Sequence, residues 1–280
     1  MPKGQGWSRV EEVVAEVSAH GLAGVSLVGP DGATWQQFGD RKFNPASTLK
    51  IPVMVEIYRK IDAGELALDD SWTLTDDDRV GGSGVLNQMR SGTAITLYDL
   101  IYLMISISDN LATDVLINKA GLEAINRTMA DLGMKNSRLV STIRSHFEEL
   151  RSPNAMPTEL GAATPNDYAG AIAAILDGKA ASEASCVAMT EMLEKQQNHR
   201  RIARYLPPMF TAAGIRFGSK TGTMRGVCNE AGFVMGQNGR LVIAVYTENY
   251  NDTHTAEQVI GEIARAAMAD TGVVGPVYTS

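Results

Sequence analysis

The sequence predicts an α+β fold, an α/β sandwich in which the N- and C-terminal helices flank an antiparallel sheet and an all-helical domain is inserted. Strand-like segments gather at the two ends of the chain, and none is evident from residue 48 to 205. That middle stretch carries helical periodicity instead. We therefore expect a discontinuous α/β domain from residues 1–45 plus 205–280 and an all-helical domain from residues 46–204, with the active site between them.

The N-terminal piece predicts one helix and one hairpin. Ser8 with Glu11 indicates a capping box, and valines recur on one face of the segment that Gly21 ends. Residues 22–28 and 33–38 alternate around a Pro-Asp-Gly turn, which is typical of strand, turn and strand.

The middle of the chain shows at least two helices by their start signals. Thr96 with Asp99 predicts a cap for a helix that runs through Ile105. Residues 111–119 begin another helix, a few residues further on.

The C-terminal piece predicts three strands and a closing helix. The strands cover residues 215–222, 232–235 and 241–247, and an Asn-Gly turn joins the last two. Thr255 opens a final helix with one apolar face, so both ends of the chain can contribute to one sheet.

Charge and hydropathy exclude several classes of partner. The 280 residues carry a formal charge of −7, and the only basic group, Arg200, Arg201 and Arg204, is expected on a solvated helix face. This argues against nucleic acid. No apolar run approaches the ~18 residues that span a bilayer, so we expect no membrane partner. A monomer acting on a small molecule is the expectation.

The sequence does not decide in which cellular compartment the protein works. The first six residues do not resemble a signal peptide, so the enzyme is periplasmic or secreted if a leader was trimmed, and cytoplasmic otherwise. Cys186 and Cys228 lack motif spacing, and we expect both to be free and structural.

Three short motifs carry the chemistry. Ser47 and Lys50 form the only Ser-x-x-Lys pair in the chain, and Ser108-Asp109-Asn110 and Lys220-Thr221-Gly222 follow it in order. A serine hydroxyl needs a base within hydrogen-bond reach to act as a nucleophile. Helical residues three apart share a face, so Lys50 serves as that base if burial or nearby positive charge lowers its pKa.

The third motif is expected to provide that charge. Lys220 would lower the pKa of Lys50 and attract an anionic substrate group, with the Thr221 hydroxyl beside it. Gly222 has no side chain, so a substrate can approach the strand closely there.

These motifs, with residues 103–113 around the second one, resemble the class A β-lactamases, a family of penicillin-recognising serine hydrolases. The resemblance runs from Trp7 to Met268. It implies a β-lactamase/transpeptidase-like fold, no metal or other cofactor, and an acyl-enzyme on Ser47 formed as the amide bond of a β-lactam opens.

The resemblance also assigns roles to further residues. The backbone NH groups of Ser47 and Thr223 would form the oxyanion hole. Ser108 would pass a proton to the leaving nitrogen and Asn110 would donate to the substrate amide. Apart from the resemblance, Arg225 lies a short way after the third motif and is expected to share the substrate carboxylate with Lys220.

The family's water-activating glutamate, in a motif that reads roughly Glu-x-Glu-Leu-Asn, has no clean counterpart. The nearest text is residues 147–151; matching its leucine places Phe147 at the glutamate position, and matching the spacing from Ser108 leads to Arg144. Glu148, Glu149 and Glu159 are the candidates for the base. Residues 80–84, Val-Gly-Gly-Ser-Gly, occupy the stretch where the family usually has an aromatic residue walling the cleft.

Two other functions remain open from the sequence. One is an amidase, esterase or peptidase on the same scaffold that acts on a non-lactam acyl substrate, and the other is a slowly deacylating penicillin-binding sensor. A zinc enzyme and an α/β-hydrolase are disfavoured because the four histidines are scattered and no Gly-x-Ser-x-Gly motif exists. Residues 214–221 miss the phosphate-binding loop pattern by one position.

Overall fold

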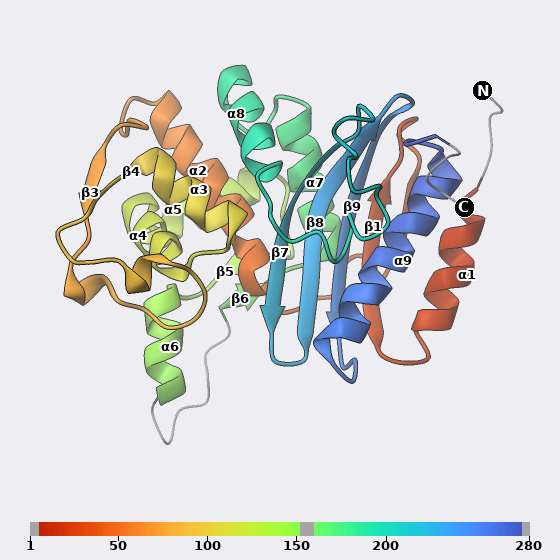
Figure 1. Ribbon diagram of the computed structural model, residues 1–280, viewed down its shortest axis with the longest axis horizontal. Coiled ribbons are helices and arrows are strands. Elements are labelled where there is room, and N and C mark those ends of the chain that lie inside the picture. The colour runs from red at the N-terminus through yellow and green to blue at the C-terminus, as the bar shows by residue number, and fades with distance from the viewer. Residues whose placement is uncertain (1–5, 152–159, 276–280) are drawn as a thin grey trace.

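The central sheet has five antiparallel strands in the order β2-β1-β9-β8-β7 (Figure 1). The computed structural model describes residues 6–151 and 160–275. The strands are β1 (Leu22–Val28), β2 (Thr34–Gln37), β7 (Arg216–Met224), β8 (Val227–Gly236) and β9 (Gly239–Glu248). Strand β1 lies between β2 and β9, so the two ends of the chain share one sheet, as the sequence predicts.

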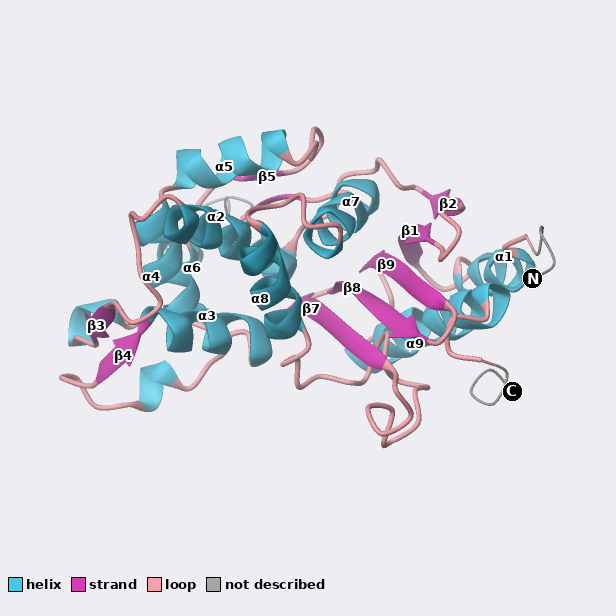
Figure 2. Cartoon of the chain, turned by 90° about the horizontal axis from the view of Figure 1, so that it is seen from above, coloured by secondary structure: helices cyan, strands magenta, loops and turns pink. Residues whose placement is uncertain are grey.

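Helices cover both faces of this sheet (Figure 2). Helices α1 (Ser8–Val17) and α9 (Thr253–Thr271) pack together on one face, and α7 (Pro165–Leu176) lies on the other. Because both faces are covered, β8 and β9 are buried continuously through residues 228–234 and 241–247. The apolar core is correspondingly divided into one cluster under α1 and α9 and a larger one toward the helical region.

The helical region is built around α2 (Lys50–Asp62), whose first nine residues are all buried. Around it lie α3 (Leu97–Ser106), α4 (Asn110–Ala120), α5 (Leu122–Asp131), α6 (Ile143–Arg151) and α8 (Glu183–Leu193). Burial along α2 fixes the position of its first residue, Lys50, deep in the protein.

The region between residues 48 and 205 nevertheless contains short strands, which the sequence reading missed. Two ladders form, β3 (Ser71–Thr73) with β4 (Ala94–Thr96) and β5 (Arg138–Leu139) with β6 (Gly161–Ala162). Segments of two or three residues are too short to show the alternation on which strand prediction depends.

One predicted helix cap is wrong, one is confirmed, and one helix begins earlier than predicted. Helix α1 has no side-chain cap at its N-terminus; the NH of Val10 donates to Asp270 Oδ2 at 3.0 Å instead. The cap at Thr96 is confirmed, since its hydroxyl accepts from the NH of Asp99 at 3.1 Å. Helix α9 begins at Thr253, two residues before Thr255. Its N-cap is Asp252, whose carboxylate accepts from the NH of Thr255 at 2.8 Å.

Cys186 and Cys228 are free and buried, as expected. Among the described residues, no helix combines the length and apolar character needed to cross a membrane.

Candidate active site

Ser47 lies in a short 3-10 helix, η1 (Ala46–Leu49), directly ahead of α2. The chain enters this turn through Ala46, whose φ of 44° is left-handed and whose NH donates to Asn44 Oδ1 at 2.8 Å. The Thr48 hydroxyl donates to the carbonyl of Pro45 at 2.7 Å. Local side chains therefore fix an otherwise costly turn and present Ser47, half-buried, to the solvent.

Lys50 is completely buried, and its ammonium group is held by the Ser108-Asp109-Asn110 loop. Its Nζ donates to the Ser108 carbonyl at 2.8 Å, to Ser108 Oγ at 2.9 Å and to Asn110 Oδ1 at 2.9 Å. Burial lowers the pKa of Lys50 to about 7, and the negative charge of Asp109 opposes that shift. A lysine with this pKa is substantially neutral at physiological pH, which is what a general base requires.

The loop between α3 and α4 is held by Asp109. Its carboxylate accepts from the NH of Ala112 at 3.0 Å, as N-cap of α4, and from the NH groups of Val85 and Leu86 at 2.6 and 2.9 Å. Ser108, just before it, adopts a φ of 62°. The Ser-Asp-Asn order is thus explained by structure as well as chemistry, because the aspartate fixes the loop that presents its two neighbours.

Strand β7 brings the third motif against η1. A Cβ on Gly222 would lie 3.0 Å from the Ser47 nitrogen and 2.9 Å from the Pro45 carbonyl oxygen, closer than side-chain carbons pack. Glycine at this position therefore allows the strand to contact the turn that carries Ser47.

Lys220 is buried behind that contact, where its Nζ donates to the Thr221 carbonyl at 2.8 Å. Its pKa lies well below the ordinary lysine value because of burial first, then the positive charges of Lys50 and Arg201, with Glu230 opposing. The sequence predicts that Lys220 lowers the pKa of Lys50; in the structure burial is what lowers the pKa of Lys50, and the charge of Lys50 acts on Lys220 instead.

Arg201 corrects the expectation of a solvated helix face. It is 1% exposed and lies in the segment after α8. Its guanidinium donates to the Gly222 and Asn229 carbonyls at 3.0 and 2.7 Å and to the Thr223 hydroxyl at 2.6 Å. An ion pair with Glu257 at 3.3 Å offsets part of the cost of burying it. No local pattern distinguishes this arginine from its exposed neighbour.

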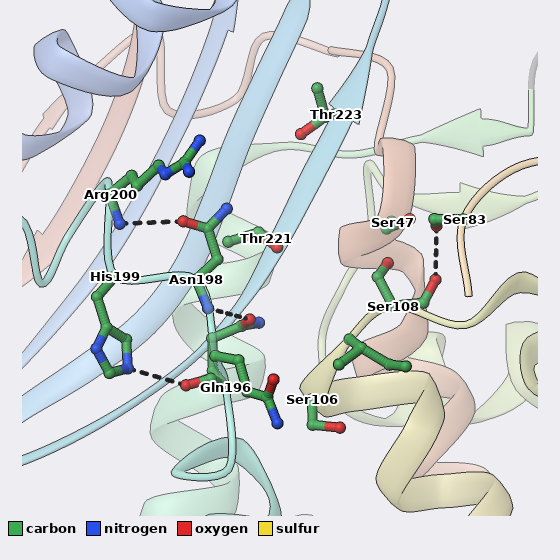
Figure 3. Close-up of a pocket in the computed structure, with 12 residues that line it drawn as sticks. Ser47, Ser83, Ser106, Ser108, Gln196, Asn198, His199, Arg200, Thr221 and Thr223 are labelled. Carbon is green, nitrogen blue, oxygen red and sulfur yellow. Dashed lines mark hydrogen bonds between the residues drawn. The ribbon is translucent and has the colours of Figure 1, made fainter. Parts of the chain in front are cut away.

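A cavity of about 720 Å³ opens over these groups (Figure 3). Its lining residues come from η1, the end of α3 and the loop after it, the segment after α8, β7 and the loop ahead of β4: Ser47, Ser83, Ser106, Ile107, Ser108, Gln196, Gln197, Asn198, His199, Arg200, Thr221 and Thr223. Lys50, Asn110 and Lys220 are buried behind this wall. Sequence reasoning did not find Ser83 or residues 196–200, because loop residues that line a cavity carry no periodic signal.

Three of the predicted site residues that the structure describes neither line this cavity nor are buried behind the residues that line it. Arg225 is exposed in the turn between β7 and β8 and borders a different cavity of about 410 Å³. Glu148, which is exposed, and Glu149, which is half-buried, lie on α6. Glu159 falls outside the described residues.

The two alignments with the family's glutamate motif lead to Arg144 and Phe147, and both of these residues have structural roles. The NH of Arg144 donates to Asp114 Oδ1 at 2.8 Å, and its side chain reaches the Asp77 carbonyl at 2.7 Å. Phe147 packs so closely on Gly81 that a Cβ there would lie 2.7 Å from its ring. Within residues 6–151 and 160–275, no group of three or more His, Cys, Asp or Glu side chains is arranged to hold a metal.

A profile of the β-lactamase enzyme family matches residues 8–270. The chain belongs to that family. A β-lactamase from Rhodobacter capsulatus is 33% identical over 134 residues, 46% of this chain and 45% of that relative, so the aligned segment spans less than half of the relative's length.

Solved β-lactamase structures extend the likeness to the whole fold. A β-lactamase from Sphaerobacter thermophilus superimposes with a TM-score of 0.90 at 48% identity, covering 97% of this chain and 100% of the other. A variant of the last common ancestor of Gram-negative class A β-lactamases gives a TM-score of 0.81 at 25% identity, covering 93% and 97%. The predicted fold class and family are both confirmed.

Proposed function

We propose that this β-lactamase family member hydrolyses the amide bond of β-lactams through an acyl-enzyme on Ser47. The observation that carries the proposal is the environment of Lys50. This lysine is buried, its pKa is lowered to about 7, and its Nζ is hydrogen-bonded to Ser108 and Asn110 beneath the cavity that Ser47 lines. A serine, a lysine that is neutral at physiological pH and a second hydroxyl are the groups that acyl transfer requires.

Acylation moves a proton through this cluster. Ser47 Oγ attacks the lactam carbonyl carbon while its proton passes to Lys50 Nζ. The ring C–N bond then breaks, and the nitrogen takes the Ser108 hydroxyl proton. Ser108 recovers a proton from the Lys50 ammonium, whose Nζ lies 2.9 Å away. We assign the oxyanion to the backbone NH groups of Ser47 and Thr223.

We assign the orientation of the substrate to residues of the second and third motifs, which lie on the two sides of Ser47. Asn110 is assigned to the substrate amide, and its own Oδ1 is fixed by Lys50 at 2.9 Å. The substrate carboxylate is assigned to Lys220 and Thr221, while Arg225, which borders the other cavity, is given no part.

Deacylation needs a base that takes a proton from water. We assign this role to Glu148 or Glu149 on α6, following their positions next to the family's motif. Water bonds to the ester carbonyl carbon, the carboxylate takes its proton, and Ser47 Oγ leaves as an alcohol when that proton is returned to it.

Steady-state nitrocefin hydrolysis compared with intact-protein mass spectrometry tests the proposal. We expect many turnovers per enzyme and a transient adduct of one acyl group. A stoichiometric adduct without turnover would indicate the slowly deacylating sensor, and turnover of p-nitrophenyl esters alone would indicate a non-lactam substrate. We also propose that the enzyme acts as a monomer, which light scattering during gel filtration checks.

A further inference from the structure

Residues 79–86, which we call the strap, run from the 3-10 helix η2 (Asp76–Asp78) into the 3-10 helix η3 (Leu86–Gln88). The strap is hydrogen-bonded to the Ser108-Asp109-Asn110 loop, and Ser83, near its centre, lines the cavity. It is held at both ends: Arg79 donates to the Leu86 carbonyl at 2.7 Å, and Asn87 donates to the Val80 carbonyl at 2.6 Å. The strap therefore forms a closed, defined loop.

The middle of the strap fits against fixed groups that leave no room for side chains. A Cβ on Gly82, whose φ is 94°, would lie 2.2 Å from Asn110 Nδ2 and 3.0 Å from the Phe147 ring. The Asn110 side chain donates to the Gly81 carbonyl at 3.1 Å, and the Asn110 NH donates to the Ser83 carbonyl at 2.9 Å. Helix α6, through Phe147, thus presses the strap onto the loop of the second motif.

Ser83 reaches from the strap to the same atom that Lys50 uses. Its hydroxyl donates to the Ser108 carbonyl oxygen at 2.9 Å, and Lys50 Nζ donates to that oxygen at 2.8 Å (Figure 3 draws the Ser83 bond). A carbonyl oxygen has two lone pairs, so these two donors occupy its capacity. The carbonyl belongs to a residue in the left-handed region, at φ 62°, a conformation that persists only where its surroundings hold it.

We infer that Ser83 is a positioning residue for acylation, which fixes the Ser108 carbonyl and hydroxyl against the Lys50 ammonium group. The inference rests on the proposed function only in its choice of reaction, since any acyl transfer to Ser47 uses the same three groups. Nothing in the Ser-x-x-Lys, Ser-Asp-Asn or Lys-Thr-Gly motifs includes this residue.

The inference predicts both a rate effect and a pH effect. A carbonyl that already accepts one hydrogen bond is a poorer partner for an ammonium ion, so loss of the Ser83 hydroxyl should favour protonated Lys50. The other charged groups facing Lys50 are Asp109, on the loop, and Lys220, on β7, which itself interacts with Arg201. None of these is changed by substitution of Ser83, so a shift in the pH profile reports the shared carbonyl.

The test compares Ser83→Ala with two matched variants. Ser83→Thr keeps the hydroxyl. Ser91→Ala removes another exposed serine hydroxyl, which donates to Asp76 at 2.5 Å, accepts from Arg79 at the end of the strap at 3.1 Å and does not line the cavity, so it tests whether loosening the strap alone changes the rate. Acylation rates are measured by stopped flow from about pH 5.5 to 9 with two probes, a fluorescent penicillin and a neutral p-nitrophenyl ester.

We expect Ser83→Ala to slow acylation at neutral pH by about threefold to tenfold and to move the midpoint of the rising pH profile upward, for both probes. Ser83→Thr and Ser91→Ala should match the wild type. An unchanged rate and midpoint in Ser83→Ala would overturn the inference, as would a slowed rate with an unmoved midpoint and a lowered Tm, which indicates a structural role. If the wild type reacts with the ester and not the penicillin, the proposed function fails and the ester profile still decides the role of Ser83; reaction with neither probe refutes both.

Discussion

Lys50 Nζ lies 2.9 Å from Ser108 Oγ, so the proposed base and the proposed proton donor to the leaving nitrogen are directly hydrogen-bonded. They come from positions 58 residues apart in the chain and are joined where the start of α2 meets the loop before α4. A direct bond lets the proton taken from Ser47 reach the leaving group without passing through solvent.

Ser47→Ala should abolish covalent labelling by a fluorescent penicillin and leave the fold intact. The side chain is half-buried at the cavity, so removing its oxygen deletes the nucleophile with little loss of packing. Intact-protein mass spectrometry and thermal unfolding measure the two effects. The same adduct on the alanine variant would show that another residue is acylated.

Lys50→Ala should slow acylation by at least ~10²-fold, the usual loss for a general base. In the wild type, the rate should rise with pH and level off above about 7, because only neutral Lys50 accepts the serine proton. Stopped-flow acylation across pH measures both. A flat profile, or an unchanged rate in the variant, would remove Lys50 from the mechanism.

Lys50 should also make the free energy of unfolding depend on pH. Its pKa is about 7 when folded and 10.5 when unfolded, so the unfolded state binds more protons between these values and stability should rise with pH across that interval. Lys50→Met should flatten this part of the curve of unfolding free energy against pH. Urea unfolding at several pH values checks it, with Lys60→Met, at a partly exposed lysine on the same helix, as the control.

Lys220→Ala should impair substrates that bear a carboxylate far more than neutral esters, because the lost attraction is Coulombic. Because burial and the charges of Lys50 and Arg201 lower the pKa of Lys220, its positive charge is lost at a lower pH than that of an ordinary lysine, and wild-type affinity for anionic substrates should fall as pH rises. KM for a carboxylate substrate and its neutral ester, measured across pH, tests both. Equal losses for the two substrates would restrict Lys220 to a structural or pKa-tuning role.

Glu148→Gln and Glu149→Gln should separate the two candidates for the deacylating base. The variant of the true base should accumulate acyl-enzyme with little change in acylation, because an ester persists unless a base activates water. Burst amplitude and adduct lifetime identify it. Two unaltered lifetimes would show that neither carboxylate serves, and would direct attention to Lys50 or to Glu159.

The three motifs and the sheet were predictable because their signals are local. Thr96 caps a helix with a partner three residues away, and strands β1 and β9 carry their own apolar runs. The wrong helix cap has the opposite cause. The start of α1 is satisfied by Asp270, 260 residues from the NH that it accepts, and a capping box read from neighbours could not include it.

The same limit applies to the site. Arg201 is buried because β7 and α9 surround it, whereas Arg200, directly before it, is exposed and lines the cavity. Ser83 matters through an acceptor on Ser108, in a different loop. Long-range contacts of this kind leave no spacing pattern in the chain.

The two buried thiols have a practical consequence for handling the enzyme. Each is 2% exposed, and burial raises the pKa of Cys228 to about 12, so neither should react readily with maleimides. A single thiol introduced at exposed Glu12 would then be the selective attachment point, on α1, across the sheet from the helical region (Figure 1). An enzyme tethered there to a sensor chip would be held through a helix that contributes no residue to the cavity wall.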